Sequence, residues 1–164
     1  MIYALHGNLG SAADWAAIDL PGLVAVDLWK WQETHPGISL EAFGRRFTES
    51  LPADDEAPVL LGYSLGGRLA LHALAASPSR WKAAILISVH PGLESAEARG
   101  GRVKADQAWA DRARQDDWTT FLEDWNSQPV LAGQEPGKEQ GELVLRLAPL
   151  RQGTGAGRKR TKIP

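Results

Sequence analysis

The residues that could carry chemistry centre on a serine between two glycines, in the run Gly62-Tyr63-Ser64-Leu65-Gly66. A serine hydroxyl is a weak nucleophile that must be held exposed beside a base. A tight strand-to-helix turn does this, because it places the side chain at the carboxyl edge of a sheet. An apolar run precedes Ser64 and an amphipathic pattern follows it. We therefore interpret the turn as a nucleophile elbow rather than a structural glycine turn.

A second candidate element is the loop His6-Gly7-Asn8-Leu9-Gly10, which follows the first apolar run. The backbone N–H groups of Asn8 and Leu65 are expected to form an oxyanion hole, since the first N–H groups of a helix have no intrahelical partner. His6 is expected to shape this loop rather than to shuttle protons, because strand-end histidines commonly satisfy nearby backbone groups. The Asn8 side chain serves equally well as a turn former.

Basic side chains follow the serine and recur later in the chain. Arg68 lies one helical turn after Ser64, where its guanidinium either binds a substrate carboxylate or forms a surface ion pair. Arg99 and Arg102 are three residues apart and either line the same pocket or are simply solvated. The sequence leaves both readings open.

Other candidates are less specific. Trp109, Trp118 and Trp125 either wall a pocket or pack helices together, and Trp125 is kept as a candidate substrate contact. His90 is the best substitute base, although the following Pro-Gly pair favours a structural turn. The aspartates after residue 110 are too scattered for a metal cluster, so we predict no metal and no cofactor.

The elements that must position these residues alternate between strands and helices. Apolar runs predict buried strands at 2–5, 23–28, 59–61 and 83–89. Capping residues and amphipathic patterns predict helices at 11–18, 39–51, 65–76, 95–115 and 117–126. This alternation predicts an α/β fold with a doubly wound, mostly parallel sheet.

Composition divides the chain and narrows its partners. We expect a core over 1–94, a helical cap over 95–150, and a disordered tail over 151–164 with five basic residues and no acidic one. A net charge of -2 gives no reason to expect nucleic acid or a membrane as partner, and favours a small-molecule substrate. The absence of cysteine excludes disulfides, and the absence of a secretory leader predicts a cytoplasmic protein. The oligomeric state stays open.

The motifs resemble the 2-succinyl-6-hydroxy-2,4-cyclohexadiene-1-carboxylate synthases of menaquinone biosynthesis, which have the α/β-hydrolase fold. The likeness covers about residues 1–130, and rests on the elbow with its Gly-Gly-Arg extension, on His90-Pro91-Gly92-Leu93 and on Trp125-Asn126-Ser127-Gln128-Pro129-Val130. The resemblance implies that the serine initiates proton abstraction, that pyruvate is eliminated, and that arginines hold the substrate carboxylates. It carries these roles onto Ser64, Arg68, Arg102 and Arg146.

The chain also departs from that family. Family members continue through two more strands that supply the triad aspartate and histidine, in the order Ser, Asp, His. The pattern is lost after Gln140, so we interpret the chain as truncated or frame-shifted, with little turnover of its own. The alternatives are a serine esterase of the same fold, or a non-catalytic remnant that binds an anion or a partner through its unfinished sheet.

Overall fold

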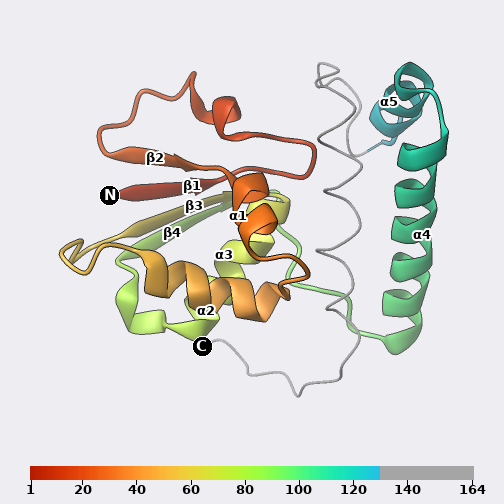
Figure 1. Cartoon of the computed structure of the whole chain (residues 1–164). Coiled ribbons are helices and arrows are strands. Elements are labelled where there is room, and N and C mark those ends of the chain that lie inside the picture. Colours follow the sequence, from red (N-terminus) through yellow and green to blue (C-terminus); the bar gives the residue numbers. More distant parts are fainter. Residues whose placement is uncertain (130–164) are drawn as a thin grey trace.

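The protein is described by a computed structural model that places residues 1–129. Its centre is a four-stranded parallel sheet in the order β2-β1-β3-β4 (Figure 1). The strands are β1 (Ile2–Leu5), β2 (Leu23–Val26), β3 (Val59–Tyr63) and β4 (Ala83–Ile87). Parallel pairing brings all four carboxyl ends to one edge. That edge positions the candidate site.

Helices α2 (Leu40–Ser50) and α3 (Leu65–Ala76) pack against each other on one face of the sheet (Figure 1). Alternating strand residues such as Tyr3, Leu5 and Leu60 point into the core between this face and the helices. The residues between them, Ala4 and Leu61, point to the other face, where Trp15 covers them. The period-2 alternation therefore gives the sheet two buried faces over β1 and β3.

Three predicted elements are shorter than expected, and the strand expected over 59–61 is longer, since it extends to Tyr63. The second strand ends at Val26, because the Asp27 carboxylate accepts hydrogen bonds from Trp29 N and Lys30 N, both at 3.0 Å. That cap starts an unpredicted helix, α1 (Leu28–Thr34). The helix expected over 11–18 is only a 3₁₀ turn, η1 (Ala12–Trp15). The fourth strand stops at Ile87, because the next residue has a positive φ of 52°.

Strand β4 forms an exposed edge of the sheet. All five of its residues are exposed, and Ile85 keeps 49% of its surface open to solvent. Among residues 1–129, no strand pairs with its free side. The strand therefore presents unpaired backbone groups together with apolar side chains.

The last two described helices, α4 (Ala96–Gln115) and α5 (Trp118–Asn126), lie beyond the carboxyl ends of the strands (Figure 1). We call them the helical pair. Their predicted caps are present, since Ser95 Oγ accepts from Ala98 N at 3.0 Å and Asp117 accepts from Thr119 N at 3.1 Å. No helix within residues 1–129 is both long and apolar enough to cross a bilayer.

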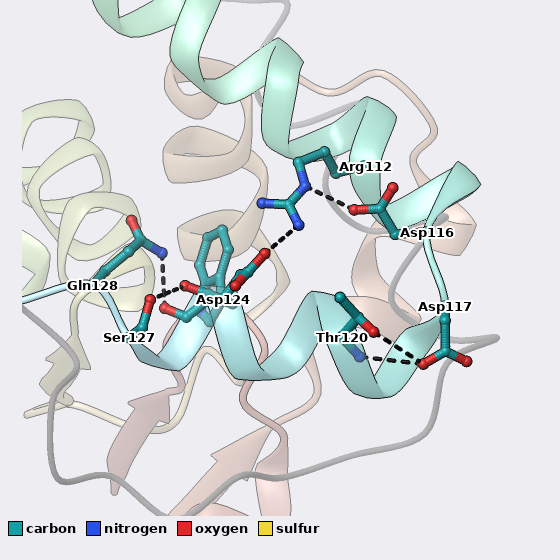
Figure 2. Close-up of polar contacts among 8 residues, drawn as sticks. Arg112, Asp116, Asp117, Thr120, Asp124, Ser127 and Gln128 are labelled. Carbon is teal, nitrogen blue, oxygen red and sulfur yellow. Dashed lines mark hydrogen bonds and ion pairs between the residues drawn. The ribbon is translucent and has the colours of Figure 1, made fainter.

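Aromatic packing and one arginine hold the helical pair together. Phe121 is fully buried, and stacked or edge-on contacts join it to the tryptophans of the pair, Trp109, Trp118 and Trp125. Arg112 on α4 binds Asp116 at 2.7 Å and reaches across to Asp124 on α5 at 2.5 Å (Figure 2). Its guanidinium also lies over the Trp109 ring, 5.0 Å from the centroid. We refer to these rings with Ala110 and Ala113 as the aromatic cluster.

Candidate active site

Ser64 lies in the turn between β3 and α3, with φ of 51° and ψ of -110°. An L-residue rarely adopts such a backbone, and it persists only where surrounding contacts hold it. Here the Ser64 N–H donates to the Ile87 carbonyl at 2.9 Å, and the Ser64 carbonyl accepts from Arg68 N at 3.1 Å. The turn is thus held by β4 on one side and by the first turn of α3 on the other.

The elbow requires glycine at position 66. A Cβ atom there would collide with the carbonyl group of Leu5 and lie 2.6 Å from the His6 oxygen. These are backbone atoms at the end of β1 and cannot rotate away. The start of α3 therefore packs directly against the end of β1, which brings the candidate loop to the serine.

The loop after β1 lies against Ser64. A Cβ atom built on Gly7 would be 3.5 Å from the Ser64 Cβ and 2.9 Å from the Tyr63 ring. Within the loop, the Gly10 N–H donates to the Gly7 carbonyl at 3.1 Å. The indole N–H of Trp29 donates to the Gly10 carbonyl at 2.6 Å and ties the loop to α1.

His6 is buried, and both of its ring nitrogens serve the backbone. Nε2 accepts a hydrogen bond from Leu28 N at 3.2 Å, so Nδ1 carries the proton and donates to the Gly7 carbonyl at 2.9 Å. Its ring also packs on Trp29, with 5.1 Å between centroids. These contacts give His6 the structural role that the sequence favoured and leave it no lone pair for general-base work.

The backbone N–H groups of Asn8 and Leu65 face no competing acceptor within residues 1–129. Leu65 is the first residue of α3, and neither N–H donates a hydrogen bond to another described residue. Unpaired N–H groups at a helix start and in an adjacent loop suit a developing oxyanion. Leu9, which follows Asn8, has a positive φ of 62°.

Arg68 is partly buried on the first turn of α3. Within the described residues its guanidinium makes no hydrogen bond or ion pair. Burial lowers its pKa, the nearby Arg102 lowers it further, and Asp106 opposes the change. A partly buried guanidinium of this kind, one helical turn after Ser64, can form charge-assisted hydrogen bonds with a carboxylate.

The other two candidate arginines are already engaged. Arg102 forms a 2.8 Å ion pair with Asp106, although its side chain stays 59% exposed. Arg99 donates to the carbonyls of Leu93 and Glu94 at 2.9 and 2.8 Å, which ties α4 to the segment before it. Arg102 also lies close enough to Arg68 to lower its pKa. Arg99 instead has a structural contact with the segment before α4, which its spacing from Arg102 in the sequence did not indicate.

The remaining candidates are placed as follows. His90 is exposed, and its Nδ1 accepts from Gly92 N at 3.1 Å, as a structural turn requires. Trp125 packs edge-on against Trp109, with centroids 5.1 Å apart, inside the aromatic cluster. Arg146 lies outside the described residues, as does the tail expected over 151–164. Residues 1–129 contain no group of acids and histidines able to hold a metal ion.

Comparison with known proteins identifies the family. The model of the alpha/beta hydrolase fold matches residues 41–151, more than half of the chain. The chain belongs to the α/β-hydrolase family. The fold class predicted from the sequence is therefore confirmed.

Individual relatives are more specific. The chain is 35% identical to the 2-succinyl-6-hydroxy-2,4-cyclohexadiene-1-carboxylate synthases of Yersinia pestis (strain Pestoides F) and Yersinia pseudotuberculosis serotype O:3 (strain YPIII), over 87% of this chain and 55% of each relative. The chain thus spans about half the length of these curated relatives. The solved structure of MenH from S. aureus superimposes with a TM-score of 0.67 at 18% identity, covering 93% of this chain and 66% of that one. This likeness to MenH concerns the fold.

Proposed function

We propose that the chain carries the nucleophile and substrate-binding part of a cytoplasmic 2-succinyl-6-hydroxy-2,4-cyclohexadiene-1-carboxylate synthase. In this proposal Ser64 initiates proton abstraction, and the substrate then eliminates pyruvate. The N–H groups of Asn8 and Leu65 stabilise the negative charge that develops on the substrate. The curated relatives of this name support the assignment.

The observation that carries the proposal is the guanidinium of Arg68, which has no hydrogen-bond or ion-pair partner within residues 1–129. It lies one helical turn after Ser64, partly buried, and Arg102 adds positive charge nearby. An esterase for neutral acyl groups gains nothing from two cations there. A lyase for a polycarboxylate needs them to bind its substrate. We further propose that the helical pair covers this site as a cap, and that Arg99 on α4 and Trp125 on α5 are its candidate substrate contacts.

The histidines of the chain, all within residues 1–129, offer Ser64 no well-placed base. His6 uses both ring nitrogens, and His90 accepts a turn hydrogen bond at Nδ1, which leaves its proton on Nε2. His35 stacks on Trp31 at the end of α1. His72 lies two turns beyond Ser64 on α3. We therefore propose that this chain alone binds substrate but turns it over slowly.

Binding of succinate tests the cation site directly. Arg68→Ala should weaken succinate binding by about 1.5–3 kcal/mol, since a sheltered charge-assisted contact is lost. Arg45→Ala is the matched control, because Arg45 is exposed on α2. The binding is measured by NMR titration of the two variants and the parent chain. Equal affinities in all three would remove the basis of the proposal.

Turnover separates the remaining alternatives. Pyruvate release from the synthase substrate is compared between the chain, Ser64→Ala and His90→Ala. We expect little release from any of the three. Substantial release that is lost in His90→Ala would make His90 the base. Rapid hydrolysis of a neutral ester, insensitive to Arg68→Ala, would instead identify an esterase.

A further inference from the structure

The loop beside Ser64 contacts the helical pair through Leu9, a residue with a strained backbone. Leu9 has a φ of 62°, a left-handed conformation that a leucine adopts only when its surroundings impose it. Its side chain packs against the aromatic cluster of the helical pair. The hydrogen bond from Gly10 N–H to the Gly7 carbonyl closes a turn that places Leu9 at its third position, and the Leu9 side chain then meets helices more than 80 residues away along the chain.

The opposite side of the loop is fixed by the core. His6 holds the Gly7 carbonyl, and Trp29 holds the Gly10 carbonyl. Leu9 lies between these two ties, next to the N–H group of Asn8. Because both flanks are tied to the start of α1, the Leu9 contact is a point at which the helical pair can change the geometry of the loop.

The helical pair itself is held by a bridge that does not touch the loop. Arg112 joins α4 to Asp124 on α5 (Figure 2). Its guanidinium also lies over the Trp109 ring. Loosening this bridge should shift the rings against which Leu9 packs. Arg114 offers a matched comparison, because its one ion pair among residues 1–129 is with Asp111, within α4, at 2.9 Å.

We infer that Leu9 is a positioning residue through which the helical pair fixes the turn of residues 7–10 and so aims the Asn8 N–H group. The inference rests on the proposed function only for the use of that N–H as an oxyanion donor. In this arrangement the position of the helical pair and the conformation of residues 7–10 change together. Substrate that draws the two helices down would order the loop at the same time.

Amide hydrogen exchange of the ligand-free chain tests this link. Leu9→Ala keeps a Cβ but removes the packing, and should speed exchange at Gly10, whose N–H closes the turn on the Gly7 carbonyl, by about three- to tenfold. Arg112→Ala should do the same from a distance, and Leu9→Met, which restores an apolar side chain, should keep exchange at the parent rate. Arg114→Ala should leave the Gly10 amide unchanged.

Coupling is read from the double variant. If the helical pair acts through Leu9, Arg112→Ala adds no further exchange at Gly10 once Leu9 is alanine. Additive effects, or a Gly10 amide that ignores Arg112→Ala, would overturn the inference. Because no substrate is present, these outcomes are independent of succinate binding and pyruvate release, on which the proposed function depends.

Discussion

At the scale of single residues, the site depends on side chains that serve the backbone. His6 was expected to shape its loop from its position at a strand end, but its partner Leu28 N lies 22 residues further along the chain. Likewise, Trp29 reaches Gly10 across 19 residues. Sequence patterns show local turns such as the elbow. They do not show contacts that exist only because β1 and β2 lie side by side.

Tyr3 provides a pH-dependent test at this scale. Its buried hydroxyl donates to Asp55 at 3.0 Å, and its pKa is raised first by burial and then by that hydrogen bond. A raised pKa favours the protonated form in the folded state, so this stabilisation is complete below about pH 10 and is lost as the pH rises further. The free energy of unfolding should therefore fall in strongly alkaline solution.

Denaturant unfolding as a function of pH measures the effect. Tyr3→Phe should flatten the alkaline fall, while the parent chain keeps it. Tyr63→Phe is the control, since the chain has only two tyrosines. An identical alkaline slope in Tyr3→Phe and the parent would show that Tyr3 is not responsible.

At the scale of elements, the sequence predicted which helices and strands exist better than it predicted where each of them begins and ends. Strands β1, β3 and β4 and helices α2 to α5 all lie where apolar runs and caps placed them. Helix α1 was missed, because Leu28 and Trp29 continue an apolar run and Asp27 was not recognised as its cap. The strained φ values at Leu9 and Ser88 had no sequence signal, since neither residue type favours a left-handed backbone.

The packing of α3 against β1 gives a sharp prediction. Gly66→Ala should destabilise the fold by about 1–3 kcal/mol or more, because the new methyl group meets immobile backbone at Leu5 and His6. Gly100→Ala should instead stabilise it by about 0.5–1 kcal/mol, since nothing lies within 4 Å of that position in α4. Both values come from urea unfolding. Similar changes in the two variants would contradict the close approach.

At the scale of the whole molecule, the exposed edge at β4 leads to a prediction about how copies of the chain associate with one another. Its apolar side chains include Ile85, Leu86 and Ile87, and no charge interrupts the strand. Such edges pair with other chains, and a lysine on the edge strand suppresses this pairing. We expect the chain to associate with rising concentration and Ile85→Lys to reduce that association, measured by sedimentation velocity. Ile18→Lys is the control, an exposed isoleucine outside the sheet. A monomeric parent chain would refute the expectation.

The two ends of the sheet are built differently. At the amino end, Tyr3 and the chain's first amino group converge on Asp55 in ordinary, relaxed conformations. At the carboxyl end, Leu9, Ser64 and Ser88 all hold left-handed backbones. The strained residues thus lie at the edge of the sheet where chemistry is proposed. We expect the backbone at this edge to loosen first on warming. We therefore expect heating to change the geometry of the candidate site at a lower temperature than that at which the sheet unfolds.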